Sequence, residues 1–118
     1  MARQQQPEII AGWIARTDNS VLVAVDDDDS ILAVGSVTDA GEITLNYVSP
    51  QARFRGVSRA LLAALEARAA ERGNTLCRLY STETAHRFYL ANGYADEGEL
   101  IRKFGMNSGY SMSKRIWI

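Results

Sequence analysis

The sequence predicts a mixed α/β fold in which a three-stranded antiparallel meander is joined to a parallel pair of strands. Three stretches rich in apolar and β-branched residues, at 21–25, 31–37 and 43–48, are separated only by short connections with turn-forming residues. Helical hydrophobic spacing then begins near Gly56, and a further strand is predicted at 75–80. Because a helix separates the third and fourth strands, these two are expected to be parallel neighbours.

The segment before the meander is predicted to be a short amphipathic helix from Pro7 to Arg16. Proline suits the first helical turn, where its missing N–H is not needed. Four large apolar residues fall at helical spacing on one face: Ile9, Ile10, Trp13 and Ile14. Asp18 and Asn19 are expected to end this helix before the first strand.

The helix that begins near Gly56 is predicted to pack on the sheet and to end at Gly73. Its apolar stripe consists of Val57, Ala60, Leu61, Ala64 and Leu65, whereas the side chains expected to face outward are Arg68, Glu71 and Arg72. A second helix is expected after helix-start residues at 81–83, with a packing face formed by Ala85, Phe88 and Tyr89 and a stop at Asn92-Gly93. Two last strands are predicted at 99–104 and 110–116.

Composition indicates a single globular domain that spans residues 1–118. Of the 118 residues, 47% are hydrophobic and 23% are charged, and the net charge is −1. The whole chain therefore has neither the basic balance of a nucleic-acid-binding protein nor that of a membrane-binding one. The first residues are polar and glutamine-rich, unlike a signal peptide, and no apolar run approaches membrane-spanning length. A cytoplasmic protein is predicted.

No metal site is predicted. The lone cysteine, Cys77, has no neighbouring ligand and is expected to be a buried thiol in a strand. The four aspartates at 26–29 lack the interleaved ligands and the glycine of a calcium loop. They are interpreted as the solvated tip of a hairpin.

The loop between the third strand and the first long helix carries the chemistry. The first turn of a helix has unpaired N–H groups and a partial positive charge, and so attracts anions. Gly56 allows a ligand to approach the backbone closely, Ser58 adds a hydroxyl, and three cations surround them: Arg53, Arg55 and Arg59. A diphosphate fits this arrangement, and the sequence lacks both the P-loop and the dinucleotide glycine patterns. Taken alone, the loop is equally consistent with a solvated basic turn.

Two motifs make the interpretation specific. Arg53-x-x-Gly56-x-Ser58 resembles the acyl-CoA motif R/Q-x-x-G-x-G/A of the GNAT superfamily of N-acetyltransferases. The segment Ala85-x-x-Phe88-Tyr89-x-x-Asn92-Gly93-Tyr94 resembles the second motif of that family. The two occur in the family's order, separated by one helix and one strand, and the resemblance extends from about Val21 to Tyr94.

The resemblance implies that acetyl-CoA is the co-substrate. In such enzymes the pantetheine arm lies between two diverging strands and bonds to exposed backbone, which here corresponds to Asn46, Tyr47 and Val48. The pyrophosphate is expected on the amides of Phe54, Arg55, Gly56, Val57 and Ser58, with phosphate contacts from Arg53, Arg55 and Arg59. Thr82 stands near the pantetheine, where the family often has asparagine, and Ser58 replaces the usual small final residue of the first motif.

Tyr89 matches the family tyrosine that often protonates the departing thiolate, and a backbone N–H near Val48 is expected to polarise the thioester carbonyl. The general base stays open between Glu42, Glu83, His86 and a chain of waters. The acceptor is expected to be a small-molecule or peptide amine.

One departure from the family concerns the start of the chain. The family usually opens with a strand and a helix for which there is no room before Pro7. These elements help to wall the acceptor pocket. Without them, the pocket is open, or another subunit completes it, or the chain is a shortened form of the family domain. Exposed edge strands are compatible with a homodimer. Two alternatives to an acetyltransferase remain: a non-catalytic acyl-CoA-binding module, and a phosphate-binding regulatory domain unrelated to CoA.

Overall fold

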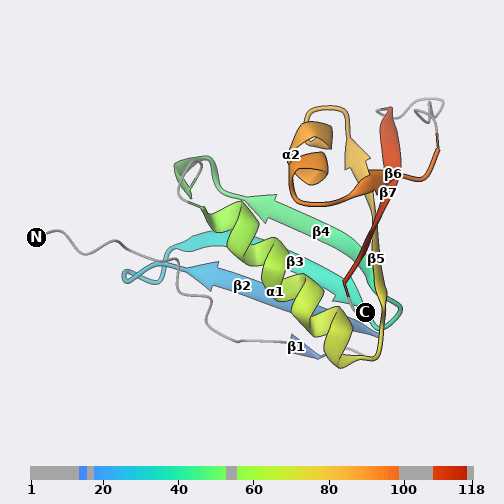
Figure 1. Cartoon of the computed structure of the whole chain (residues 1–118). Coiled ribbons are helices and arrows are strands. Elements are labelled where there is room, and N and C mark those ends of the chain that lie inside the picture. The colour runs from blue at the N-terminus through green and yellow to red at the C-terminus, as the bar shows by residue number, and fades with distance from the viewer. Residues whose placement is uncertain (1–13, 16–17, 53–55, 99–107, 117–118) are drawn as a thin grey trace, which may run out of the picture.

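The computed structural model describes residues 14–15, 18–52, 56–98 and 108–116. Within them, seven strands form one sheet in the order β1-β2-β3-β4-β5-β7-β6, and helix α1 lies across one face of it (Figure 1). The elements are β1 (Ile14–Ala15), β2 (Asn19–Val25), β3 (Ile31–Thr38), β4 (Glu42–Val48), the 3₁₀ turn η1 (Pro50–Ala52), α1 (Val57–Glu71), β5 (Leu76–Thr82), α2 (His86–Ala91), β6 (Ala95–Asp96) and β7 (Gly109–Arg115). The predicted mixed α/β class is confirmed.

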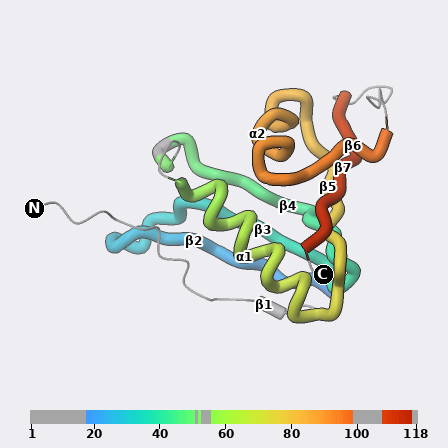
Figure 2. Tube along the Cα trace, in the orientation of Figure 1, coloured from blue at the N-terminus to red at the C-terminus, as the bar shows by residue number. Residues whose placement is uncertain are grey.

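The sheet combines an antiparallel meander with one parallel joint. Strands β1 to β4 pair antiparallel in sequence, and β4 then pairs parallel to β5. Strand β5 pairs antiparallel with β7 along its whole length, from Leu76 opposite Arg115 to Thr82 opposite Gly109. The two helices therefore lie over different parts of the sheet. In Figure 2, α1 crosses the meander, whereas α2 lies beside the upper ends of β5 and β7.

The N-terminal helix prediction is wrong where the structure can test it. Ile14 and Ala15 form β1, which pairs antiparallel with β2 through Ile14 opposite Val21 and Ala15 opposite Ser20. Asn19, expected to stop a helix, begins β2. The free edge of β2 offers backbone partners, and this tertiary pairing outweighs a helical spacing whose intrinsic preference is weak. The rest of the predicted helix, and the strand predicted at 99–104, lie outside the described residues.

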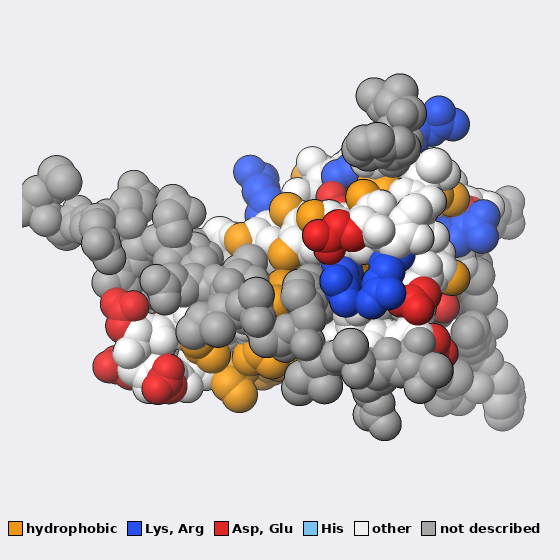
Figure 3. Space-filling view, turned by 90° about the horizontal axis from the view of Figure 1, so that it is seen from below, with side chains coloured by type: hydrophobic (Ala, Val, Ile, Leu, Met, Phe, Trp, Pro, Cys, Tyr) orange, Lys and Arg blue, Asp and Glu red, His pale blue; other side chains and the backbone are white. Residues whose placement is uncertain are grey.

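The turn between β2 and β3 is a hairpin tip, as predicted. One carboxylate oxygen of Asp26 accepts hydrogen bonds from the N–H groups of Asp28, at 2.9 Å, and of Ser30, at 3.0 Å. The neighbouring aspartates are exposed, and acidic side chains gather at that end of the molecule in Figure 3. The Asp26 carboxylate thus satisfies turn backbone, which is a local structural role.

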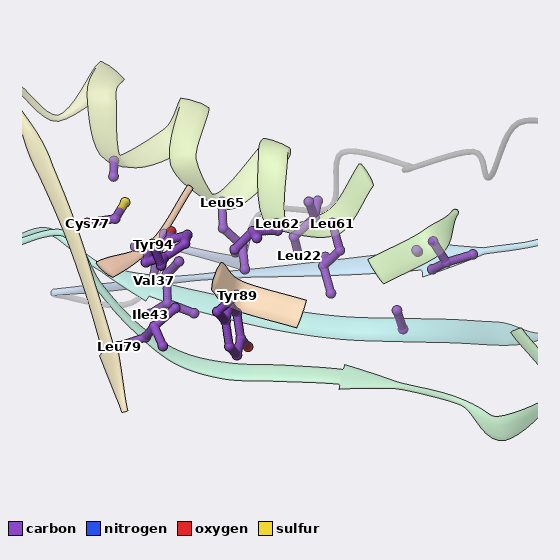
Figure 4. Packing of buried hydrophobic residues seen from close by; sticks show 14 of the residues in the cluster. Leu22, Val37, Ile43, Leu61, Leu62, Leu65, Cys77, Leu79, Tyr89 and Tyr94 are labelled. Atoms are coloured by element: carbon purple, nitrogen blue, oxygen red, sulfur yellow. The ribbon is translucent and has the colours of Figure 1, made fainter. Parts of the chain in front are cut away.

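Helix α1 packs closely on the meander because β3 carries a glycine under it. A Cβ at Gly35 would lie 2.9 Å from Cδ1 of Leu65, so a larger residue would push the helix away. The buried residues of the helix are Val57, Leu61, Leu62, Leu65 and Ala69, several of which are visible in Figure 4. The predicted stripe is therefore confirmed at Val57, Leu61 and Leu65. Arg68, expected to face outward, instead donates from Nε to the buried Ser20 hydroxyl at 3.0 Å.

A partly buried polar cluster lies where α1 meets β5 and β7. The carboxylate of Glu66 accepts hydrogen bonds from the Tyr94 hydroxyl, at 2.9 Å, and from Lys114 Nζ, at 3.1 Å. Cys77 is fully buried nearby, as predicted. Burial and, secondarily, the Glu66 charge raise the pKa of the Cys77 thiol to about 11 from its ordinary 9.0.

This pKa shift predicts a loss of stability in mild alkali. Between pH 9 and 11 the unfolded chain releases the Cys77 proton while the folded protein retains it, so the free energy of unfolding falls as the pH rises. The slope from this one group approaches about 1.4 kcal/mol per pH unit. Urea unfolding at pH 9.0, 9.5 and 10.0 gives the free energy of unfolding at each pH. This free energy should fall less steeply with pH in Cys77→Ala than in the wild type. Equal slopes for the two proteins would contradict the prediction.

Candidate active site

An extra residue in β4 determines which of its side chains face α1. Val37 of β3 lies opposite Ile43, but the residue before it, Ser36, lies opposite Leu45, so Thr44 forms a β-bulge. The Thr44 hydroxyl lies 2.7 Å from the Ser36 hydroxyl. Simple alternation would have grouped Leu45 with Ile43 on one face. The bulge instead leaves Leu45 44% exposed.

Beyond the bulge, Asn46 faces the same side of the sheet as Ile43. It pairs with Gly35, whose missing side chain would point at α1. Tyr47 faces the other way and is 53% exposed, while Val48 is partly buried opposite Ala33. Only Asn46 among these three strand-end residues therefore presents its side chain to the cleft described next.

A cleft opens where β4 and β5 part. The two strands pair only at Glu42 opposite Arg78 and Ile43 opposite Leu79, after which they run in diverging directions (Figure 1). The space between them and α2 measures about 470 Å³ including its open mouth. It is lined by Ile43, Thr44, Leu45 and Asn46 of β4, by Leu79, Tyr80, Ser81 and Thr82 of β5, and by Ala85 and Tyr89. This is the diverging strand pair that the sequence resemblance implies.

Tyr89 reaches from α2 into this cleft towards β4 (Figure 4). Its side chain is 8% exposed, and its phenolic oxygen accepts a hydrogen bond of 2.9 Å from Nδ2 of Asn46. The rings of Phe88 and Tyr94 contact it edge-on, with centroids 5.2 and 5.6 Å away. Burial raises the pKa of Tyr89, and the Asn46 hydrogen bond opposes this rise. The phenol is therefore neutral at physiological pH and has a proton to give.

The short helix α2 is fixed by contacts at its first residue. His86 Nε2 lies 2.7 Å from a carboxylate oxygen of Asp96 in β6, and its ring stacks on Tyr110 of β7 with centroids 3.6 Å apart. The imidazole considered as a base thus contacts a carboxylate and an aromatic ring. Glu83, the other candidate on this side, is exposed and does not line the cleft.

Thr82 is the last residue of β5 and lies at the cleft, whereas the sequence pattern predicted that it belongs to the start of the second helix. Residues 81–82 belong to β5, and α2 begins only at His86. The Thr82 hydroxyl accepts a hydrogen bond of 3.2 Å from the Ala85 N–H. Thr82 therefore shapes the turn into α2 and is one of the residues that line the cleft.

The start of α1 leaves its first turn uncapped by side chains. Gly56, with φ of 76°, occupies the N-cap position, and no side-chain cap hydrogen bond is present among the described residues. A Cβ built at Gly56 would meet nothing within 4 Å. Arg59 is exposed and Ser58 is partly exposed, so this turn is accessible from outside. Arg53, Phe54 and Arg55 lie outside the described residues.

Comparison with known proteins agrees with this geometry. A family model described as "Acetyltransferase (GNAT) domain" matches residues 2–115. The chain belongs to the GNAT acetyltransferase family. No curated protein matches the chain.

Solved structures show the same GNAT fold. A GCN5-related N-acetyltransferase from Rhodopseudomonas palustris superposes with a TM-score of 0.74 and 23% identity over 82% of this chain and 61% of its own. Nourseothricin acetyltransferase gives 0.73 and 25%, covering 85% and 66%. The PaiA N-acetyltransferase of Thermoplasma acidophilum, solved with coenzyme A, gives 0.70 and 22%, covering 83% and 61%. The chain thus spans about two thirds or less of the length of these three structures.

Two further properties concern the described part of the GNAT chain. No helix in it has both the length and the apolar character needed to cross a membrane. Its histidine, cysteine and acidic side chains nowhere gather in a group of three or more suited to a metal ion.

The contacts of His86 predict its contribution to stability. His86→Ala should lower the free energy of unfolding by about 2 kcal/mol, since it removes both a hydrogen bond and an aromatic stack. His86→Phe keeps a ring over Tyr110 and should lose only about 1 kcal/mol. Chemical denaturation of the two variants and the wild type measures the difference. If both substitutions cost the same, the stack with Tyr110 does not contribute to stability.

Proposed function

We propose that this protein is an N-acetyltransferase that moves an acetyl group from acetyl-CoA directly to a primary amine. The observation that carries the proposal is the buried, neutral phenol of Tyr89, which lies in the cleft where β4 and β5 part. Membership of the GNAT family and the coenzyme A bound by the Thermoplasma relative support the same co-substrate.

The pantetheine arm fits the parting of the strands for a backbone reason. After Ile43, β4 has no pairing with β5 among the described residues. From Asn46 to Val48, the backbone N–H and C=O groups of β4 that face β5 can therefore bond the two amides of the pantetheine arm. Thr82 lies on the opposite wall of the cleft. Two strands that stayed paired would satisfy these groups internally and leave no room for a ligand.

The diphosphate is assigned to the start of α1. The amides of Gly56, Val57 and Ser58 lie in an uncapped first turn, where an anion is stabilised by the unpaired N–H groups and by the helix dipole. Arg59 adds a cation one residue further along. By the sequence motif, Arg53, Phe54 and Arg55 complete this cradle.

The proposed reaction is a direct attack of the amine on the thioester. The amine lone pair forms a C–N bond at the acetyl carbon, and a backbone N–H near Val48 stabilises the oxyanion. The C–S bond then breaks, and the sulfur takes the proton of Tyr89 as it leaves. The ammonium proton passes through solvent to restore the phenol. No described carboxylate lines the cleft, so water is the first acceptor of that proton.

The proposed acceptor is a primary amine. One similar structure is named nourseothricin acetyltransferase, which makes nourseothricin the first compound to test, followed by aminoglycosides, polyamines, amino acids and peptide N-termini. The alternative of a non-catalytic acyl-CoA-binding module is favoured by one observation: the described cleft lining contains no acidic or imidazole side chain.

Substitution of Tyr89 separates these two functions. Tyr89→Phe should lower kcat for CoA release about 100-fold, because a positioned acid is lost, while leaving the Kd of acetyl-CoA nearly unchanged. Tyr94→Phe is the matched control, since it removes a buried hydroxyl that bonds Glu66 outside the cleft, and should retain activity. Calorimetric titration gives Kd, and thiol release with an amine panel gives kcat. Tight acetyl-CoA binding without turnover of any amine by the wild type would favour the binding module, and no binding at tens of micromolar would contradict both functions.

A charge introduced in the first turn of α1 tests the diphosphate position. Ser58→Glu should weaken acetyl-CoA binding at least about tenfold by repulsion, yet leave the Tm unchanged or slightly higher, because an acid near a helix N-terminus is stabilising. Ser58→Gln has nearly the same size without the charge and should bind better than Ser58→Glu at low salt. Equal affinities for the two variants would place the diphosphate elsewhere.

A further inference from the structure

The hydrogen bond between Asn46 and Tyr89 has a direction that matters for catalysis. Nδ2 of Asn46 donates to the phenolic oxygen across 2.9 Å. A phenol can accept one hydrogen bond while donating its own proton elsewhere. Within the described residues the Tyr89 hydroxyl donates to no group of the protein. Its proton therefore remains available to a ligand in the cleft.

The amide side chain of Asn46 has one polar atom that the described residues do not pair. The bulge at Thr44 brings its side chain to the α1 face, where it is partly buried and lines the cleft. Its other amide atom, Oδ1, is buried and has no hydrogen-bond partner among the described residues. A buried, unpaired carbonyl oxygen costs free energy that an apolar side chain of similar shape would avoid. The contact of Nδ2 with Tyr89 gives a reason for an amide at this position.

We propose that Asn46 is a positioning residue, whose amide N–H holds the Tyr89 oxygen so that the phenolic proton faces the cleft. This inference rests on the proposed role of Tyr89 as the donor to the leaving sulfur. When the proton leaves, the same N–H group bonds a phenolate, and a hydrogen bond to a charged oxygen is stronger than one to a neutral oxygen. Asn46 thus favours the transition state over the ground state.

The opposite arrangement makes a different prediction. If the amide were turned so that Oδ1 accepted the phenolic proton, Asn46 would hold that proton away from the leaving group. Donation by Nδ2 lowers the pKa of Tyr89, whereas acceptance by Oδ1 would raise it. The sign of the pKa change when the amide is removed therefore distinguishes the two orientations.

The first experiment measures the Tyr89 phenol in the unliganded protein. Tyrosine labelled with ¹³C at Cζ is titrated by NMR, with Tyr89→Phe identifying the resonance. Asn46→Leu removes the amide at similar volume and should raise the Tyr89 pKa. Asn46→Asp puts an acceptor carboxylate in its place and should raise it further. A lower pKa in Asn46→Leu would overturn the proposal.

The second experiment is a double-mutant cycle on turnover. Asn46→Leu should lower kcat about three- to tenfold, the effect of one hydrogen bond, with the KM of acetyl-CoA unchanged. In a Tyr89→Phe background the same substitution should have no further effect, because the phenol is the only partner of the Asn46 side chain in the proposed reaction. Losses that multiply in the double variant would show that Asn46 acts on another group, and would overturn the assignment.

The two experiments distinguish an error in the role of Asn46 from an error in the proposed acetyltransferase function. Absence of turnover in the wild type would remove the acetyltransferase and, with it, the catalytic meaning of the contact, while the NMR titration would still report which atom of Asn46 bonds Tyr89. Turnover in the wild type, together with kcat losses that multiply in the double variant or a lowered Tyr89 pKa in Asn46→Leu, would leave the acetyltransferase intact and refute only the role of Asn46.

Discussion

The parting of β4 from β5 is the constraint on which the candidate site depends. A parallel pair that stayed in register would bury its backbone groups in hydrogen bonds, but here pairing ends after Ile43 and Leu79. The bulge at Thr44 lies directly beyond this point, where a β-bulge bends and twists its strand. One extra residue therefore accompanies both the opening of the cleft and the turn of Asn46 towards α2.

Packing elsewhere holds the two walls of the cleft in place. The β4 wall belongs to the meander. Helix α1 packs on one face of the meander and holds it in place, because the helix approaches Gly35 of β3 closely. The β5 wall is fixed by its full-length pairing with β7, and α2 is tied to the same side by the contacts of His86. Each wall thus has its own support, so the strands can separate between them without loss of the surrounding structure.

The sequence predicts the helices and strands that form this site more accurately than it predicts their geometry. The motifs placed Tyr89, Thr82 and the start of α1 in one functional region, and hydrophobic spacing located most strands and both helices. The bulge could not be predicted from the sequence, because the alternation in 43–48 indicates a regular strand in which Leu45 shares a face with Ile43. Ile14 was misassigned for a related reason: its strand depends on the open edge of β2, a partner that local spacing does not reveal.

Two tyrosines five residues apart show how the surroundings separate a structural phenol from a reactive one. Both are buried, and burial raises the pKa of each. The Tyr94 hydroxyl donates to the Glu66 carboxylate, and the negative charge there raises its pKa further, so its proton is committed to the protein. Tyr89 meets a neutral amide that donates to it, which offsets part of the rise in its pKa and leaves its proton unbonded within the described residues. The two phenols therefore differ in position and in hydrogen bonding. Only Tyr89 lines the cleft, and only its proton is left unbonded by the described residues, as the proposed protonation of a leaving thiolate requires.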